Sequence, residues 1–294
     1  MKYYQILERV AKKITEYFNS IKPEVYTISE LGRIFRAQRR IWELPSGITR
    51  RDFIEYMLLR TNLENHIFKF PHLEYQRFTW GPGSIYSIIL SLKKNIHFSH
   101  FTAAYLHNLV EKIPQSMFVT IEQSPKKTNY HLAQLSIDNA MSKPQRITRN
   151  YANYGRRNIY LLNGKHTEST GVIKARAASG KIIPVTDLER TLIDITVRPE
   201  YAGGVFDVLE AYKRAAKNVS CERMVQYLNK INYLYPYHQS IGFYMETSKA
   251  YTSSQIEIIR TINRDFDFYL TYNIPNMEYS ERWKMFYPIE MTFI

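Results

Sequence analysis

Hydrophobic side chains recur every three or four residues near the start of the chain, as in helices that bury one face. Residues 3–18 therefore predict an amphipathic helix, whose apolar positions are Tyr3, Ile6, Leu7, Val10, Ile14, Tyr17 and Phe18. Two further helices are predicted, each introduced by a capping box, in which a Thr and an acidic residue three positions later satisfy backbone N–H groups at the helix start. Thr27 with Glu30 begins the second helix, and Thr49 with Asp52 begins the third.

The period then changes from helical spacing to alternation. The runs H-I-F-K-F and Y-Q-R-F-T-W, separated by P-H-L-E, predict two strands of a hairpin. Three helices followed by a hairpin predict a winged helix-turn-helix, and W-G-P-G at residues 80–83 predicts its end near Ser84. We therefore expect a winged helix over residues 1–84 and a second domain over residues 85–294.

The second domain mixes helical and strand-like patterns. S-I-Y-S-I-I-L-S-L and S-H-F-T-A-A-Y-L-H-N-L favour helices, the latter with Ser99 as its cap, whereas M-F-V-T-I-E and N-I-Y-L-L favour strands. Thr186 and Glu189 form a third capping-box pattern ahead of a helix, and residues 203–217 and 221–232 favour two more. The sequence thus predicts an α+β protein, with a larger mixed domain after the winged helix.

The third predicted helix raises a question about charge, because Arg50 and Arg51 occupy its first turn. The positive end of a helix dipole disfavours cations there, so a negative partner from outside is expected. In a winged helix this end enters the major groove of DNA, and an arginine that contacts guanine with two hydrogen bonds contributes about 1–3 kcal/mol of discrimination. We predict that DNA is bound by these residues together with others of the helices and the hairpin: Arg33, Arg36, Arg39, Arg40, Ser46, Thr49, Lys69 and Arg77. A protein-binding winged helix is the alternative for the same pattern, and the dozen or so residues before the third helix are more than the usual short turn.

The formal net charge is +13, and the excess is concentrated in two blocks, residues 1–90 and 141–181. The second block opposes nine Lys and Arg residues with one acidic residue, Glu168, and interleaves them with Tyr151, Tyr154 and Tyr160. It predicts either a second polyanion-binding patch or a charged rim on strands. Its candidate residues are Lys143, Arg146, Arg149, Arg156, Arg157, Lys165, Lys174 and Arg176, with Lys181 at its end.

Other chemistry finds little support in the sequence. The single cysteine, Cys221, excludes a disulfide framework within the chain and suits a reducing cytosol, and no stretch is long and apolar enough to cross a membrane. His97, His100 and His107 lack the further ligands that a zinc site needs, so we expect no metal and no cofactor. Asp265 and Asp267 form a D-x-D that could hold magnesium, but no Gly-Ser loop precedes it; a metal-dependent enzyme acting on nucleic acid is therefore the alternative to a non-enzymatic protein.

Three further motifs resemble AbiEi-type antitoxins of the bacterial AbiE abortive-infection systems. They are S-H-F-T-A-A-Y-L-H-N-L at residues 99–109, V-T-D-L-E-R-T-L-I-D-I at 185–195 followed by R-P-E-Y-A-G-G, and I-G-F-Y-M-E at 241–246. The resemblance extends from the winged helix to about residue 250 and does not cover the Tyr-rich end. From the residues themselves, Glu189, Arg190 and Asp194 are expected to be structural, the last two as an i,i+4 pair.

The resemblance implies a two-domain cytoplasmic protein that is not an enzyme. Its winged helix would bind repeats in the promoter of its own operon and repress transcription. Its second domain would counteract a nucleotidyltransferase toxin, in many members without a stable complex of the two proteins. The partners expected are therefore double-stranded DNA and, functionally, that toxin, with no membrane.

Overall fold

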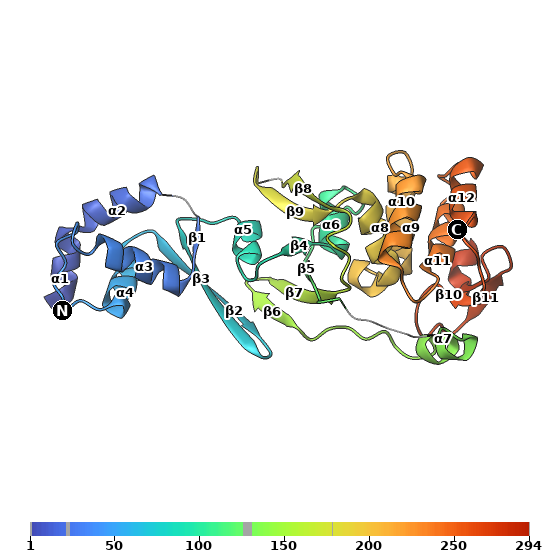
Figure 1. The fold of residues 1–294 in the computed structure, drawn as a ribbon, viewed down its shortest axis with the longest axis horizontal. Coiled ribbons are helices and arrows are strands. Elements are labelled where there is room, and N and C mark those ends of the chain that lie inside the picture. The colour runs from blue at the N-terminus through green and yellow to red at the C-terminus, as the bar shows by residue number, and fades with distance from the viewer. Residues whose placement is uncertain (1, 22–23, 126–130, 178, 294) are drawn as a thin grey trace. The chain divides into compact units, whose positions relative to one another are not determined.

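The computed structural model describes residues 2–21, 24–125, 131–177 and 179–293, and the chain divides into two compact units. The first comprises Met1–Lys94 together with Ala152–Tyr154 and Ala178–Lys181, and the second comprises the rest. The fold is mixed α+β, as the sequence predicts, with a small antiparallel sheet beside the N-terminal helices and a larger mixed sheet in the second unit (Figure 1). The expected boundary at Ser84 stays a prediction.

The first unit has the element order of a winged helix. Its elements are α1 (Lys2–Arg9), α2 (Ala11–Ser20), β1 (Val25–Tyr26), α3 (Ile28–Gln38), α4 (Arg50–Arg60), β2 (Leu63–Phe70), β3 (Leu73–Trp80) and α5 (Ile85–Leu90). β2 and β3 form the hairpin that alternation predicts, and β1 adds to it in the order β1-β3-β2.

Two features of this unit differ from the sequence-based expectation. The first predicted helix is two helices, because the backbone at Val10 leaves the helical region (φ −105°, ψ 5°), and both Leu7 of α1 and Ile14 of α2 are buried in the same core. β1 was not predicted, since two residues are too few to show alternation. Both capping boxes are confirmed, with Thr27 accepting from the N–H of Glu30 and Thr49 from that of Asp52.

The link between α3 and α4 is folded into the core rather than looped out. Trp42 is buried, stacks on Phe53 with centroids 5.6 Å apart and meets Tyr17 edge-on at 5.6 Å. Leu44 and Ile48 are buried as well. The lengthened connection is thus anchored by apolar burial, which compensates for the entropy of ordering it.

The largest sheet has six strands in the order β6-β7-β5-β4-β9-β8, and its strands belong to the second unit except for Ala152–Tyr154 of β6. Its strands are β4 (Ile96–Phe98), β5 (Ser116–Glu122), β6 (Tyr151–Tyr154), β7 (Arg157–Gly164), β8 (Val172–Arg176) and β9 (Ile182–Thr186). β5 runs parallel to β7, and β4 is parallel to β9 but antiparallel to β5. The strands predicted from M-F-V-T-I-E and N-I-Y-L-L are the adjacent β5 and β7.

The second unit also contains, among the described residues, seven α-helices and, between two of them, a short 3-10 helix. They are α6 (His100–Leu106), α7 (Gln134–Met141), α8 (Leu188–Val197), the short η1 (Pro199–Ala202), α9 (Val205–Ala215), α10 (Cys221–Ile231), α11 (Tyr237–Thr247) and α12 (Ser253–Arg260). α8 contacts α9, α10 and α11, and these helices share one core with Cys221, whose thiol is buried and has its pKa raised to about 11 by burial (Figure 1). No helix in the described residues is both long and apolar enough to span a bilayer.

The Tyr-rich tail forms a third small sheet, β10-β12-β11, from β10 (Phe268–Tyr269), β11 (Met277–Ser280) and β12 (Met285–Pro288), followed by η2 (Ile289–Phe293). Gln239 of α11 anchors it, because its side-chain nitrogen donates to the carbonyls of Trp283 (2.7 Å) and Lys284 (2.8 Å). Gly242 lets the Trp283 ring lie against α11, since a Cβ there would be 2.1 Å from that ring. The glycine of I-G-F-Y-M-E is therefore a packing requirement.

The start of α8 corrects one prediction and confirms another. Asp187, and not Thr186, caps the helix by accepting from the N–H of Arg190 at 2.9 Å. Glu189 instead accepts from the N–H of Ser220 at 2.8 Å and pairs with Arg223 at 3.3 Å, which joins α8 to the start of α10. Arg190 and Asp194 form the expected i,i+4 pair at 2.8 Å, and both are buried.

Candidate nucleic-acid interface and a cationic cavity

The first turn of α4 exposes Arg50 and Arg51 and uses its only acidic residue internally. The Asp52 carboxylate accepts from the Thr49 hydroxyl (2.6 Å) and the Thr49 N–H (2.8 Å), and these hydrogen bonds lower its pKa. Neither arginine has a carboxylate within 4 Å among the described residues. The dipole penalty on these two cations is therefore only partly offset within the protein.

Arg50 lies in the angle between α3 and α4. A Cβ added to Gly32 of α3 would be 2.7 Å from Cδ of Arg50, so the absence of a side chain at Gly32 makes room for the Arg50 stem. The helices α3 and α4 are in contact with each other. Gly32 thus makes room for the aliphatic part of the Arg50 side chain, while Arg50 as a whole stays exposed.

The remaining candidates in and after α3 and on the hairpin differ in whether a carboxylate lies nearby. Arg36 and Arg40 are exposed, and so is Ser46 in the link. Arg33 lies 3.6 Å from Glu30, and Lys69 of β2 lies 4.0 Å from Glu74 across the hairpin. Exposed pairs at such distances contribute little, so these cations can exchange their partners for phosphates.

Two of the candidate arginines have structural partners instead. The Arg39 guanidinium donates to the carbonyls of Pro45 (3.1 Å), Ser46 (3.0 Å) and Ile48, which fixes the α3–α4 link. Arg77 is buried, and it donates to the carbonyls of Ser91 (2.8 Å) and Leu92 (3.1 Å). Nη2 of Arg39 and the Arg77 guanidinium are thus engaged with oxygens of the protein itself, and a role of either residue in DNA binding stays a prediction.

The basic block of residues 141–181 is not one patch. Arg156 and Arg157 lie at the turn into β7, next to the β6 edge of the sheet, whereas Lys174 and Arg176 lie on β8 at the opposite edge. Lys143 and Arg149 are exposed in the segment before β6, and Lys181 pairs with Glu24. The sequence could not show this separation, because strand order depends on pairings between distant residues.

The interleaved tyrosines also have partners within the protein. Tyr160 stacks on Phe118 with centroids 4.9 Å apart, and Tyr154 stacks on Phe68 at 4.6 Å. The Tyr154 hydroxyl is hydrogen-bonded to His66 at 2.6 Å. Only Tyr151 keeps an exposed ring, so the block offers a nucleic acid fewer stacking surfaces than its sequence suggests.

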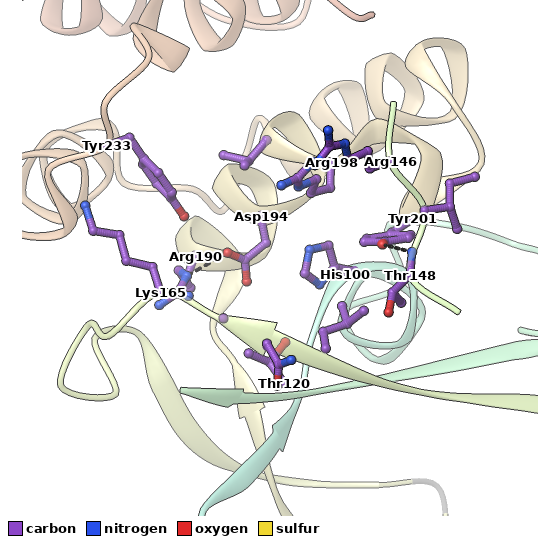
Figure 2. Close-up of a pocket in the computed structure, with 15 residues that line it drawn as sticks. His100, Thr120, Arg146, Thr148, Lys165, Arg190, Asp194, Arg198, Tyr201 and Tyr233 are labelled. Atoms are coloured by element: carbon purple, nitrogen blue, oxygen red, sulfur yellow. Dashed lines mark hydrogen bonds and ion pairs between the residues drawn. The ribbon is translucent and has the colours of Figure 1, made fainter. Parts of the chain in front are cut away.

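Two residues of the block, Arg146 and Lys165, instead line a cavity of about 420 Å³ in the second unit. Arg190, Asp194 and Arg198 line it from α8 and its C-terminal cap (Figure 2). His100, Thr120, Thr148, Tyr201 and Tyr233 complete its polar and aromatic lining. The sequence did not predict this site, because its residues are distributed over more than a hundred positions. Only Arg146 and Lys165 were candidates, as cations of the basic block.

The residues considered for metal binding do not form one group of ligands. His107 is hydrogen-bonded to the Thr186 carbonyl at 2.6 Å, and burial lowers the pKa of both His97 and His100 to about 4. The Asp267 carboxylate accepts from the Tyr279 hydroxyl at 2.5 Å, and Asp265 is exposed. Within the described residues, no three His, Cys, Asp or Glu side chains are grouped as metal ligands would be.

The architecture, an N-terminal helical unit with a small antiparallel sheet followed by a larger mixed α+β unit, is found in a known structure. The crystal structure of the RV2827C protein from Mycobacterium tuberculosis superposes with a TM-score of 0.60, over 95% of this chain and 91% of that chain. The sequences are 11% identical, so the similarity establishes the shared fold. No family model and no curated protein matches the sequence.

Proposed function

We propose that this protein is a DNA-binding transcriptional repressor, and that it is the antitoxin of a toxin–antitoxin operon. The observation that carries the DNA-binding part is the first turn of α4, where Arg50 and Arg51 project from a winged-helix element order without carboxylate partners among the described residues. Duplex DNA supplies the missing negative charge, and its major groove admits a helix in this orientation.

The surrounding surface supports the same proposal. Arg36 on α3 and Arg40 just after it are exposed. In helix-turn-helix complexes, backbone phosphates lie near the helix that precedes the recognition helix, which is the position of α3 here. Lys69 on the hairpin offers a cation for the wing. Phosphate contacts would fix the position of the protein on the duplex, and Arg50 and Arg51 would read base edges.

The antitoxin part of the proposal rests on the resemblance of three motifs to AbiEi-type proteins. In the structure these motifs form α6, α8 with η1, and α11, so they belong to one folded unit that is distinct from the winged helix. We propose that this second unit counteracts a nucleotidyltransferase toxin. Operation in the cytoplasm and the absence of enzymatic activity are part of the same proposal.

DNA binding can be tested with the full chain and a fluorescent duplex from the region upstream of its own gene. Arg50→Ala and Arg51→Ala should each weaken binding roughly tenfold, because each removes about 1–3 kcal/mol of base contact. Arg60→Ala is the matched control, since Arg60 is an exposed arginine at the other end of α4. Equal affinity of all three variants and the wild type would refute the groove assignment.

Antitoxin activity needs a separate measurement. Co-expression with the product of a neighbouring nucleotidyltransferase-like gene should restore growth, and removal of the second unit should abolish the rescue. If the R50A/R51A variant still rescues growth while losing DNA binding, the two activities reside in different units, as proposed. Failure of the wild-type protein to rescue growth would refute the antitoxin part and leave the DNA-binding part standing.

A further inference from the structure

The cavity of the second unit carries an unbalanced positive charge. Arg146, Lys165 and Arg198 line it, and none of these three has a carboxylate within 4 Å in the described part of the chain. In Figure 2, Arg146 and Arg198 lie together on one side of Asp194, and Lys165 lies on the other. A cavity with cations on two sides attracts an anion into its interior.

The one acidic residue in the cavity does not cancel this charge. Asp194 is held by Arg190, whose Nε donates to its carboxylate at 2.8 Å, and both side chains are almost completely buried. Arg190 is fixed further by Nη1, which donates to the Thr170 carbonyl at 2.7 Å. The Arg190–Asp194 pair is therefore a neutral, rigid wall. Arg146 and Arg198 remain available to a ligand, whereas the Lys165 ammonium already donates to the Asn232 carbonyl and adds its charge to the cavity from there.

A buried histidine also points into this space. His100 begins α6 with φ +51°, a left-handed conformation that is uncommon outside glycine, and its Nδ1 is hydrogen-bonded to Ser99 at 2.9 Å. The ring packs edge-on against Tyr201, and Nε2 has no hydrogen-bond partner among the described residues (Figure 2). His100 is thus 8% exposed, has an uncommon backbone conformation, and lines the cavity with one nitrogen that no described residue engages.

Two tyrosine rings, those of Tyr201 and Tyr233, also line the cavity. Tyr201 is fixed because its hydroxyl accepts from the N–H of Thr148 at 2.8 Å. Tyr233 lies opposite, with the Lys165 ammonium 5.7 Å from its ring centroid. Two tyrosines can pack against a planar or sugar-like group, whereas inorganic anions need no such surfaces.

We propose that this cavity binds a small organic phosphate about the size of a nucleoside monophosphate, with its phosphate held by Arg146 and Arg198 and its organic part between Tyr201 and Tyr233. The volume of about 420 Å³ lies within the range of roughly 300–1,000 Å³ found for small-molecule sites. Arginine matches phosphate geometry through paired N–H donors. A DNA duplex is too wide to enter such a cavity, so the ligand is a separate molecule from the DNA proposed for α4.

Calorimetric titration of the full-length protein tests this proposal. Adenosine and guanosine 5′-monophosphate should bind and raise the Tm, whereas adenosine, which lacks the phosphate, should bind at least tenfold more weakly. Tighter binding of a nucleotide than of inorganic phosphate would identify an organic phosphate as the ligand. Equal binding of adenosine and its monophosphate, or no binding of any phosphate compound at millimolar concentration, would overturn the proposal.

Two variants locate the binding site within the chain. Arg146→Gln and Arg198→Gln should each weaken nucleotide binding roughly tenfold or more, because a charged hydrogen bond to the phosphate is lost. Arg149→Gln is the matched control, since Arg149 is an exposed arginine of the same segment that does not line the cavity. Equal losses in R146Q and R149Q would overturn the assignment. Displacement of the nucleotide by a duplex without terminal phosphates would also overturn it, because these cations would then belong to a nucleic-acid surface.

Discussion

Both α4 and α8 have arginine in the first turn, and the structure uses these two sites in opposite ways. In α4, Arg50 and Arg51 are exposed, and the nearby Asp52 is occupied with the capping box. In α8, Arg190 is buried and neutralised by Asp194 one turn later. The position of the nearest free carboxylate thus decides whether an arginine at a helix start stabilises the fold or remains available to a ligand.

The largest effect expected from this comparison is on stability. Asp194→Asn should lower the free energy of unfolding by about 3–5 kcal/mol, because it leaves the buried Arg190 charge without its counter-charge. At about 2–4 °C per kcal/mol for a domain of this size, the Tm should fall by roughly 10 °C. Thermal unfolding followed by circular dichroism measures this change.

The control for this variant is an exposed pair of similar spacing. Glu210→Gln removes the i,i+3 partner of Lys213, 3.9 Å away and more than half exposed, and should change stability by less than about 0.5 kcal/mol. A similar loss in D194N and E210Q would contradict the structural role assigned to the Arg190–Asp194 pair.

An intermediate effect is expected for Arg39, which is the half-buried C-cap of α3 and has a structural role. Arg39→Lys should reduce stability by about 1–2 kcal/mol, because the shorter lysine side chain cannot bring its ammonium to the position from which Nη2 of Arg39 donates to the link carbonyls. Urea unfolding gives the size of this loss. Arg40→Lys, at the neighbouring exposed position, should be neutral, and equal stability of both variants would show that the link does not depend on Arg39.

The smallest expected effect separates stability from binding within α3 and α4. Gly32→Ala should leave stability unchanged or raise it by up to about 1 kcal/mol, since alanine favours the helix. It should nevertheless weaken DNA binding a few-fold, because the new methyl group displaces the Arg50 side chain.

The double variant decides whether that loss passes through Arg50. In an Arg50→Ala background, Gly32→Ala should cause no further loss of affinity, which a double-mutant cycle by fluorescence anisotropy would reveal. Independent, additive losses would show that Gly32 affects DNA binding by another route.

Local patterns in the sequence predicted local structure well. The capping boxes at Thr27 and Thr49 were found because their partners lie three residues away, and the β2–β3 hairpin because alternation is a local signal. The i,i+4 pair of Arg190 and Asp194 was found for the same reason. Such features depend on spacing along the chain and very little on the rest of the fold.

Interactions with distant partners were not predictable from the same patterns. Arg77 donates to carbonyls fourteen and fifteen residues away, and Glu189 accepts from Ser220, so neither role is visible in a local motif. The basic block was interpreted either as a polyanion-binding patch or as a charged rim on strands, because its residues are adjacent in sequence, and the strand order separates β6 from β8. The cavity was missed for the same reason, since six separate segments supply its side chains.

The buried state of Cys221 has a practical consequence for experiments on this molecule. Its thiol is inaccessible, and its pKa of about 11 keeps it protonated at neutral pH, so it reacts slowly with maleimides. A second cysteine introduced on either unit can therefore carry a single fluorophore or spin label without prior removal of the native one. Distance measurements between labelled DNA and chosen surface positions thus become feasible on the otherwise wild-type protein.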